Sequence, residues 1–127
     1  MQFDNNKPIA IQIEEFCRMQ ITSGGWPSDS RIPSTKDLAM RLGVNPRTVM
    51  KAYDSLAEQG AIYQKRGLGY FVAPAAIPNV LQILRRKFMT ETLPETARRI
   101  LELKLDVKYV TDMLTHMVQS LDNKQEL

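Results

Sequence analysis

The stretch Ser34–Gly60, STKDLAMRLGVNPRTVMKAYDSLAEQG, decides the fold because it contains the starts and ends of two helices. Ser34 and Asp37 form the Ser/Thr-x-x-acid pattern of a helix N-terminus. In this pattern the Ser34 hydroxyl accepts a hydrogen bond from the N–H of residue 37, and the Asp37 carboxylate returns the contact. Gly43 ends the helix. The expected apolar stripe of this short helix is Leu38, Ala39 and Leu42.

A second helix begins directly after the first. We predict Asn45 as its N-cap and Pro46 as its first residue, because the first turn of a helix leaves its N–H groups unpaired and Pro has none. Gly60 ends it. Its apolar residues recur at i, i+3, i+4 and i+7 and define a core face of Val49, Ala52, Tyr53 and Leu56. Two helices joined by a short turn predict a helix-turn-helix.

Strand-like sequence follows the helix-turn-helix. Residues 61–65 and 70–73 are rich in aromatic and β-branched side chains, and they flank the glycine-containing turn Arg66–Gly69. This arrangement predicts a β-hairpin, which in this position is a wing. Upstream, a helix is expected over residues 9–23, ended by Gly24 and Gly25. The apolar face of that helix is predicted to be Ile9, Ile13, Phe16, Cys17 and Ile21.

Helical periodicity returns after Pro74 and Pro78. We predict one helix from about residue 77 to near 91, a second capped by Thr92 with Pro94 in its first turn, and a third capped by Asp106. An apolar seam on these helices would be exposed in a monomer and buried by a second copy. The predicted dimerisation residues are Leu81, Leu84, Phe88, Ile100, Val110, Leu114, Met117 and Leu121.

The fold class is therefore mainly α with a small β-hairpin. We expect a winged helix-turn-helix DNA-binding domain over residues 1–74 and a short all-helical dimerisation region over residues 75–127. The 127 residues are 43% hydrophobic and 24% charged, which is the composition of a globular protein.

Composition also excludes several function classes. With one cysteine, Cys17, and one histidine, His116, the chain has neither a disulfide framework nor a common zinc site. Neither residue has a catalytic partner nearby in the sequence, so we expect no enzyme, no metal and no cofactor. The N-terminus lacks the pattern of a signal peptide, and no segment is apolar enough to span a membrane. A cytoplasmic protein without a membrane partner is expected.

The net charge of +3 is small, but basic residues are concentrated in one segment. Between Arg31 and Lys51 there are five basic residues and one acidic residue, as a polyanion-binding surface requires. The face of the second helix opposite its core face has Arg47, Thr48, Met50, Lys51, Asp54 and Ser55, and its first turns are the part that reaches base edges. The predicted DNA contacts are Ser34, Lys36, Asn45, Arg47, Thr48, Lys51, Arg66, Gly67 and Gly69.

Each of these residues also has a purely structural explanation. Ser34 and Asn45 are helix caps, Gly67 and Gly69 are turn residues, and Arg47 and Lys51 are charges on a solvated helix face. Together, however, they occupy the one surface that a winged helix-turn-helix presents to double-stranded DNA. That shared location favours an operator-binding function.

These residues resemble a known family. From Pro8 to Val72 the chain is similar to the winged helix-turn-helix domain of the GntR family of bacterial transcription regulators, through PIAIQI, RIPSTKDLAMRLGVNPRTVMKAYDSLAEQG and KRGLGYFV. NPRTVMKAY followed by a short helical tail resembles the YtrA subfamily. The resemblance implies a homodimer formed largely through the C-terminal helices that acts as a repressor, often of a transporter operon.

The chain departs from the family pattern at several positions. Lys36 stands where the family more often has Arg, and Asn45-Pro46 stands where many members have Ser-Arg. Tyr70 takes the place of the common wing Thr, so the resemblance implies a DNA contact for Tyr70. Because Lys lacks the planar fork of Arg, Lys36 suits a phosphate better than a base. The operator sequence therefore does not transfer from the family.

Two function classes remain open. The first is a dimeric, sequence-specific repressor that reads an inverted-repeat operator. The second is a winged-helix protein-interaction module without a specific operator, which would bind DNA only weakly and without sequence preference. The sequence names no small-molecule effector. Any effector is expected to change the spacing of the two recognition helices, which must match half-sites about one helical turn apart.

Overall fold

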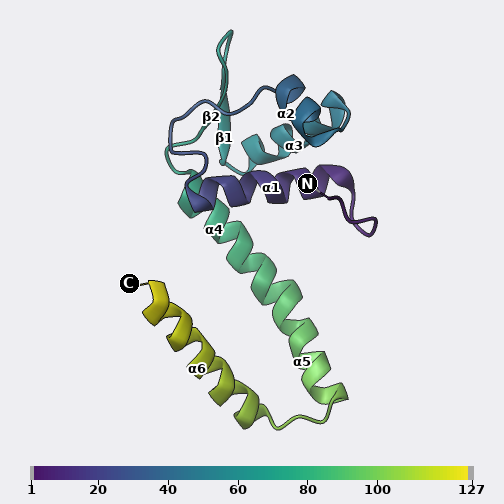
Figure 1. Ribbon diagram of the computed structural model, residues 1–127, viewed down its shortest axis with the longest axis vertical. Coiled ribbons are helices and arrows are strands. Elements are labelled where there is room, and N and C mark those ends of the chain that lie inside the picture. Colours follow the sequence, from purple (N-terminus) through teal and green to yellow (C-terminus); the bar gives the residue numbers. More distant parts are fainter. Residues whose placement is uncertain (1, 126–127) are drawn as a thin grey trace. The chain divides into compact units, whose positions relative to one another are not determined.

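The computed structural model describes residues 2–125 and divides the chain into two compact units, Met1–Leu84 (unit 1) and Arg85–Leu127 (unit 2). The division falls inside helix α4 (Ala76–Lys87). Figure 1 shows the elements of unit 1 that precede α4: α1 (Ile9–Ser23), α2 (Thr35–Leu42), α3 (Pro46–Glu58), β1 (Ile62–Lys65) and β2 (Gly69–Val72). The predicted helix-turn-helix and hairpin are confirmed.

The helix ends in unit 1 follow the capping signals of the sequence. The backbone N–H of Asp37 donates to the Ser34 hydroxyl at 3.0 Å, and the N–H of Arg47 donates to Asn45 Oδ1 at 2.9 Å. Both side chains pair donors that a helix start leaves without an intrahelical partner. Gly43 ends α2 in the left-handed conformation, with φ of 68°. These contacts fix the turn between α2 and α3.

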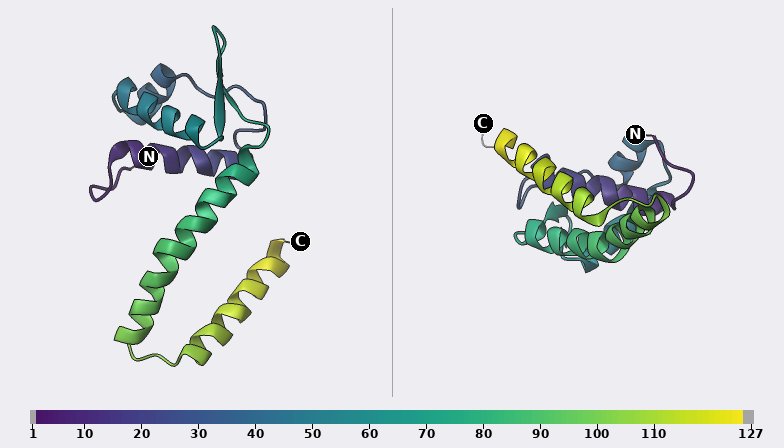
Figure 2. Two further views of the ribbon diagram at one scale, coloured as in Figure 1. Left: turned by 180° about the vertical axis from the view of Figure 1, so that it is seen from behind. Right: turned by 90° about the horizontal axis from the view of Figure 1, so that it is seen from below.

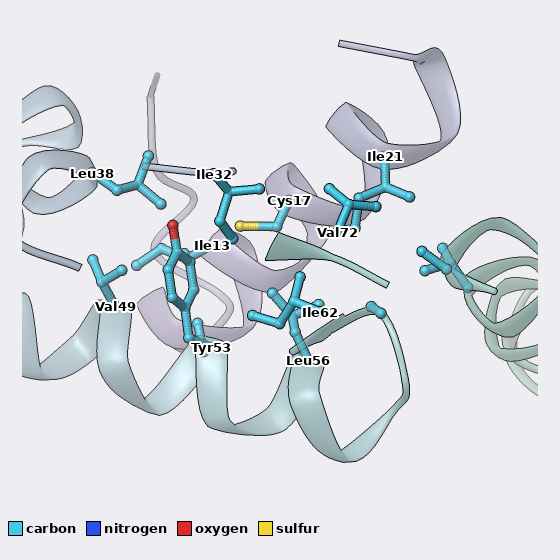
Figure 3. Packing of buried hydrophobic residues seen from close by; sticks show 14 of the residues in the cluster. Ile13, Cys17, Ile21, Ile32, Leu38, Val49, Tyr53, Leu56, Ile62 and Val72 are labelled. Carbon is cyan, nitrogen blue, oxygen red and sulfur yellow. The ribbon is translucent and has the colours of Figure 1, made fainter. Parts of the chain in front are cut away.

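The core of unit 1 gathers side chains from all of these elements around Tyr53 (Figure 3). The predicted face of α3 is fully buried, and Ile13, Cys17 and Ile21 of α1 pack against it. The Tyr53 hydroxyl donates to the backbone oxygen of Pro33 at 2.7 Å, so this buried polar group has a partner. Its ring meets the Tyr70 ring edge-on, with 5.0 Å between the ring centroids.

Two expected core positions differ from the structure by one residue. In α1, Ile9 is 44% exposed and Ala10 is buried instead. In α4, the apolar spacing of the sequence begins at Ile77, but Ile77 is 46% exposed, whereas Ala76 and Val80 are buried. A helix turns 100° per residue, so a shift of one position changes which side chain reaches the core. The spacing of apolar residues predicted both helices correctly, but it gave the wrong residue as the first buried position of each helix.

The wing consists of β1, β2 and the turn between them. The strands pair antiparallel with the register Ile62↔Val72 and Lys65↔Gly69. A third short segment runs beside β2: Arg31 pairs with Phe71, and Ile32 N–H donates to Tyr70 O at 3.0 Å. The base of the wing is therefore paired on both edges of β2.

Unit 2 contains the end of α4, a π-helical turn (Phe88–Thr92), α5 (Leu93–Glu102) and α6 (Val107–Gln125). After α5 the chain turns back through residues 103–106 into α6 (Figure 2). The predicted break before Thr92 is wrong. Thr92 has helical φ and ψ of −72° and −47° and makes no side-chain cap, and the helical path continues through it.

The π-helical turn Phe88–Thr92 explains how the helix continues through Pro94. Pro has no N–H, and its ring collides with the carbonyl one turn earlier in a regular α-helix. In a π-helical turn the hydrogen bond spans one residue more than in an α-helix. The extra residue separates the proline ring from the carbonyl one turn earlier. Threonine hydroxyls pair nearby carbonyls: Thr90 donates to Arg86 O at 2.8 Å and Thr96 donates to Thr92 O at 3.0 Å.

Burial of the Cys17 thiol should make stability depend on pH. Burial raises the pKa of this thiol from 9.0 to about 12. Above pH 9 the thiol ionises in the unfolded chain but stays neutral in the folded one, so its contribution is full below pH 9 and is lost as pH rises toward 12. Relative to Cys17→Ala, the free energy of unfolding of the wild type should fall by about 1.4 kcal/mol between about pH 8 and pH 10. Urea denaturation across this range measures the difference, and parallel curves for the two proteins would contradict it.

Candidate nucleic-acid interface

Helix α3 has two faces of opposite character. Its core face, which includes Val49 and Tyr53, is fully buried. On the other side Arg47 and Lys51 are exposed, and Met50 is 48% exposed between them. The Asn45 cap and Pro46 fix the first turn, so these cations lie at the start of the helix, where free N–H groups also favour an anion.

Helix α2 packs against α3, and Pro33, directly before α2, accepts a hydrogen bond from Tyr53 of α3. Lys36 is exposed, and Ser34 is half-buried because its hydroxyl serves as the cap. Thr48, also predicted as a contact, is half-buried. The predicted helix-turn-helix contacts thus come from the starts of two packed helices, and each is exposed or half-buried.

The wing turn brings the remaining predicted residues to one end of the hairpin. Arg66 is exposed, and Gly67 has a φ of 78°. A Cβ added at Gly67 would meet nothing within 4 Å. Glycine is therefore favoured at this position only by the left-handed backbone conformation. The Tyr70 side chain packs on Tyr53. Packing therefore accounts for Tyr70, and its contact with DNA stays a prediction.

The exposed cations of this surface form no salt bridge in the part of the chain that the structure describes. Among the described residues, no carboxylate forms a salt bridge with Lys36, Arg47, Lys51 or Arg66. Uncompensated positive charge on one surface attracts a polyanion and steers its approach. By contrast, Arg98 of α5 binds both Glu95 and Glu102.

A buried polar network joins α1 to α3 and helps to set the position of α3. Glu14 Oε1 accepts from Ser55 Oγ at 2.7 Å and from Gln59 Nε2 at 2.9 Å. Arg18 is 2% exposed, and its Nη1 lies 3.6 Å from Glu14 Oε1. Sequence reasoning missed this network and placed Ser55 on the exposed face. That placement is wrong, because the Ser55 hydroxyl is needed by a buried carboxylate of α1.

Arg31 is a second residue whose place the sequence did not predict. It belongs to the basic segment, but the short pairing with β2 has no periodicity of its own. In the structure the Arg31 side chain is exposed and its guanidinium lies beside Gly69 of the wing. A cation therefore stands next to the wing glycine that the sequence selected.

Within residues 2–124, no three His, Cys, Asp or Glu side chains lie close enough together to hold a metal ion. In the described part of the chain, no helix combines the length and the apolar character needed to cross a membrane.

The part of the chain that carries this surface is similar to a known protein family. The family model described as "Bacterial regulatory proteins, gntR family" matches residues 10–72. The chain belongs to the GntR family. That family consists of DNA-binding transcription regulators, so the predicted class, a regulator and not an enzyme, is confirmed.

Relatives extend the likeness beyond the matched domain. The uncharacterized HTH-type transcriptional regulator YhcF of Bacillus subtilis is 28% identical over 104 residues, which are 82% of this GntR chain and 84% of YhcF. A putative GntR regulator from Bacteroides thetaiotaomicron has 30% identity, with 90% of this chain and 99% of that structure covered and a TM-score of 0.75. Other curated relatives are longer, and the chain spans only 31% of one transcriptional repressor among them.

Some of the similar structures include DNA. The DNA-binding domain of AraR, solved in complex with operator ORR3, is 32% identical, with 57% of this chain and 88% of that chain covered and a TM-score of 0.53. The similar part is the winged helix-turn-helix, which contains the surface described above. GntR-type domains of this fold bind double-stranded operators.

The buried network gives a stability prediction for this GntR domain. Glu14→Ala should lower the free energy of unfolding by about 3 kcal/mol, because it leaves Arg18 buried without its counter-charge. The neighbouring Glu15→Ala is the matched control. Glu15 pairs with Lys7 at an exposed site, so its loss should cost less than about 1 kcal/mol. Urea denaturation compares the two, and equal costs would show that the network contributes no more than a surface pair.

Proposed function

We propose that the chain is a repressor that binds an inverted-repeat operator as a homodimer. In each subunit α3 enters the major groove and the wing turn reaches the adjacent minor groove. The observation that supports this most strongly is the exposed face of α3, where Arg47 and Lys51 follow a capped helix start without a salt bridge among the described residues. In this proposal residues 1–74 bind DNA and residues 75–127 form the dimer.

The residues of this surface suit different parts of DNA. The Arg47 guanidinium matches guanine O6 and N7 in bidentate geometry, so it is the proposed base reader. Lys36 and Lys51 are proposed phosphate contacts, since an ammonium interacts as a point charge. Asn45 and Thr48 supply further hydrogen-bonding groups at the helix start, and Arg66 with Gly67 and Gly69 forms the proposed minor-groove contact.

Dimer formation is proposed from the exposure of unit 2. In the part of unit 2 that the structure describes, no side chain is buried, although large apolar residues recur along its helices. Leu114, Met117 and Leu121 of α6 are each more than half exposed. A unit of this size without a core needs a partner for stability. An inverted-repeat operator would supply the two-fold symmetry that a second copy of this chain matches.

An apolar groove adds a surface for that second copy. It has a volume of about 250 Å³ and lies within unit 2 between α5, the residues before α6, and α6 itself. Its lining is Thr96, Leu105, Tyr109, Val110, Met113, Leu114 and Met117. Val110, Leu114 and Met117 belong to the seam predicted from the sequence, so the proposed seam and the groove share one face of α6. The predicted dimer residue of α5, Ile100, is half-buried.

A charge in the seam should dissociate the dimer. Leu114→Asp would place a carboxylate in a desolvated contact, which is costly without a partner. We expect sedimentation to show a monomer and operator affinity to fall by at least tenfold, since each half-site alone binds weakly. Gln119→Asp adds the same charge on another face of α6 and should stay dimeric. If Leu114→Asp also stays dimeric, the seam is assigned wrongly.

The base-reading assignment is tested by binding to DNA. Fluorescence anisotropy with a fragment from upstream of the protein's own gene and with a scrambled duplex, across a salt series, should show specific binding about 10³-fold tighter or more. Arg47→Ala should cost about 1–3 kcal/mol on the specific duplex and relax sequence preference. Lys51→Ala, one turn further along α3, should weaken both duplexes equally.

A different outcome would favour the second function class. If the wild type binds both duplexes weakly and equally, a genome-wide selection of bound fragments decides whether an operator lies elsewhere. If that selection also enriches nothing, the winged helix is a protein-interaction module and the repressor proposal is wrong.

A further inference from the structure

The outer face of the wing holds two cations on either side of a glycine. In the hairpin register Tyr63 faces Phe71 and Lys65 faces Gly69, so these side chains share one face of the sheet. The opposite face holds Ile62 and Val72, which are buried in the core. The backbone pairing of Arg31 with Phe71 puts Arg31 on the same outer face.

The absence of a side chain at Gly69 creates the space between these cations. A Cβ added there would lie 3.3 Å from Arg31 Nε and 3.6 Å from Arg31 Nη2. The Arg31 guanidinium therefore lies across the glycine backbone, next to the wing turn. Gly69 also has a φ of 101°, a conformation that side chains disfavour. Both features keep this position open for the guanidinium.

The cations on this face are not paired with a carboxylate in a salt bridge among the described residues. Neither Arg31 nor Lys65 forms a salt bridge there, and Lys65 Nζ lies 4.6 Å from the Phe71 ring centroid in a cation–π contact. The carboxylate of nearby Asp29 accepts a hydrogen bond from the Tyr63 hydroxyl at 3.4 Å. With Arg66 at the turn, three cations surround the end of the wing.

We propose that Arg31 reads the minor groove beside each half-site and gives the regulator a preference for A·T base pairs there. The wing turn brings the guanidinium to the groove, and Lys65 contacts the phosphate backbone that borders it. The inference rests on the proposed operator-binding function and adds a specificity-determining residue to it. Narrow A·T-rich minor grooves have enhanced negative potential, which attracts an inserted arginine without any base-specific hydrogen bond.

The chemistry of the side chain favours arginine for this role. A guanidinium is more weakly hydrated than an ammonium, so it enters a narrow groove at a smaller desolvation cost. Lys65 is instead held over the Phe71 ring, which suits a contact to a phosphate at the groove edge. Arg31 and Lys65 should therefore differ in what they recognise: the first senses groove width, and the second senses only charge.

The test uses the full chain and a random duplex library. Selection with the wild-type protein identifies the preferred duplex, which is then made with A·T-rich or G·C-rich flanks. We expect the wild type to prefer A·T flanks by about tenfold. Arg31→Lys should reduce this preference to about twofold and keep the salt dependence of binding, because the charge is unchanged. Lys65→Ala, the control on the same face, should weaken both duplexes by the same factor.

The outcomes separate this inference from the proposed function. If the wild type enriches no duplex, the operator-binding function fails and the Arg31 assignment fails with it. If it enriches a duplex and Arg31→Lys keeps the full preference for A·T flanks, only the Arg31 assignment is overturned. Arg31→Ala that weakens both duplexes equally would also overturn it, since Arg31 would then contact phosphate. Arg31 is exposed, so thermal unfolding of each variant should match the wild type.

Discussion

The buried ring of Tyr53 connects the parts of unit 1 that form the candidate interface. It extends from α3 into the centre of the core, its hydroxyl holds the backbone of Pro33 directly before α2, and its ring supports Tyr70 of the wing. Burial raises its pKa above the usual value for tyrosine, so the hydroxyl remains a donor. A single side chain thus contacts α3, the segment before α2 and the wing.

The helix ends of unit 1 could be predicted because their causes are local. Ser34 and Asn45 pair backbone groups two or three residues away, and Gly43 supplies a left-handed conformation at its own position. The π-helical turn could not be predicted in the same way. A threonine two residues before a proline is the signal of a helix start, and the same pair also fits within a continuous helix if one turn widens.

In the candidate site, too, the features with local causes could be predicted and those that depend on distant contacts could not. Exposure of Arg47 and Lys51 followed from the spacing of the apolar residues on α3, since a helix with one buried face must expose the other. The place of Ser55 depends on Glu14, 41 residues earlier, and no local pattern contains that partner. Arg31 likewise takes its position from Phe71 through a pairing too short to leave a period in the sequence. Contacts between distant segments decided what local reasoning missed.

The packing of Cys17 has a consequence for how the regulator can be controlled. It is the one cysteine among the 127 residues, and its side chain is completely buried between α1 and the rest of the core. Oxidants and electrophiles react with exposed thiolates, whereas this sulfur is neutral and out of reach. A redox signal would have to unfold the domain before it reached the sulfur. Thiol oxidation is thereby excluded as a reversible switch for the folded domain.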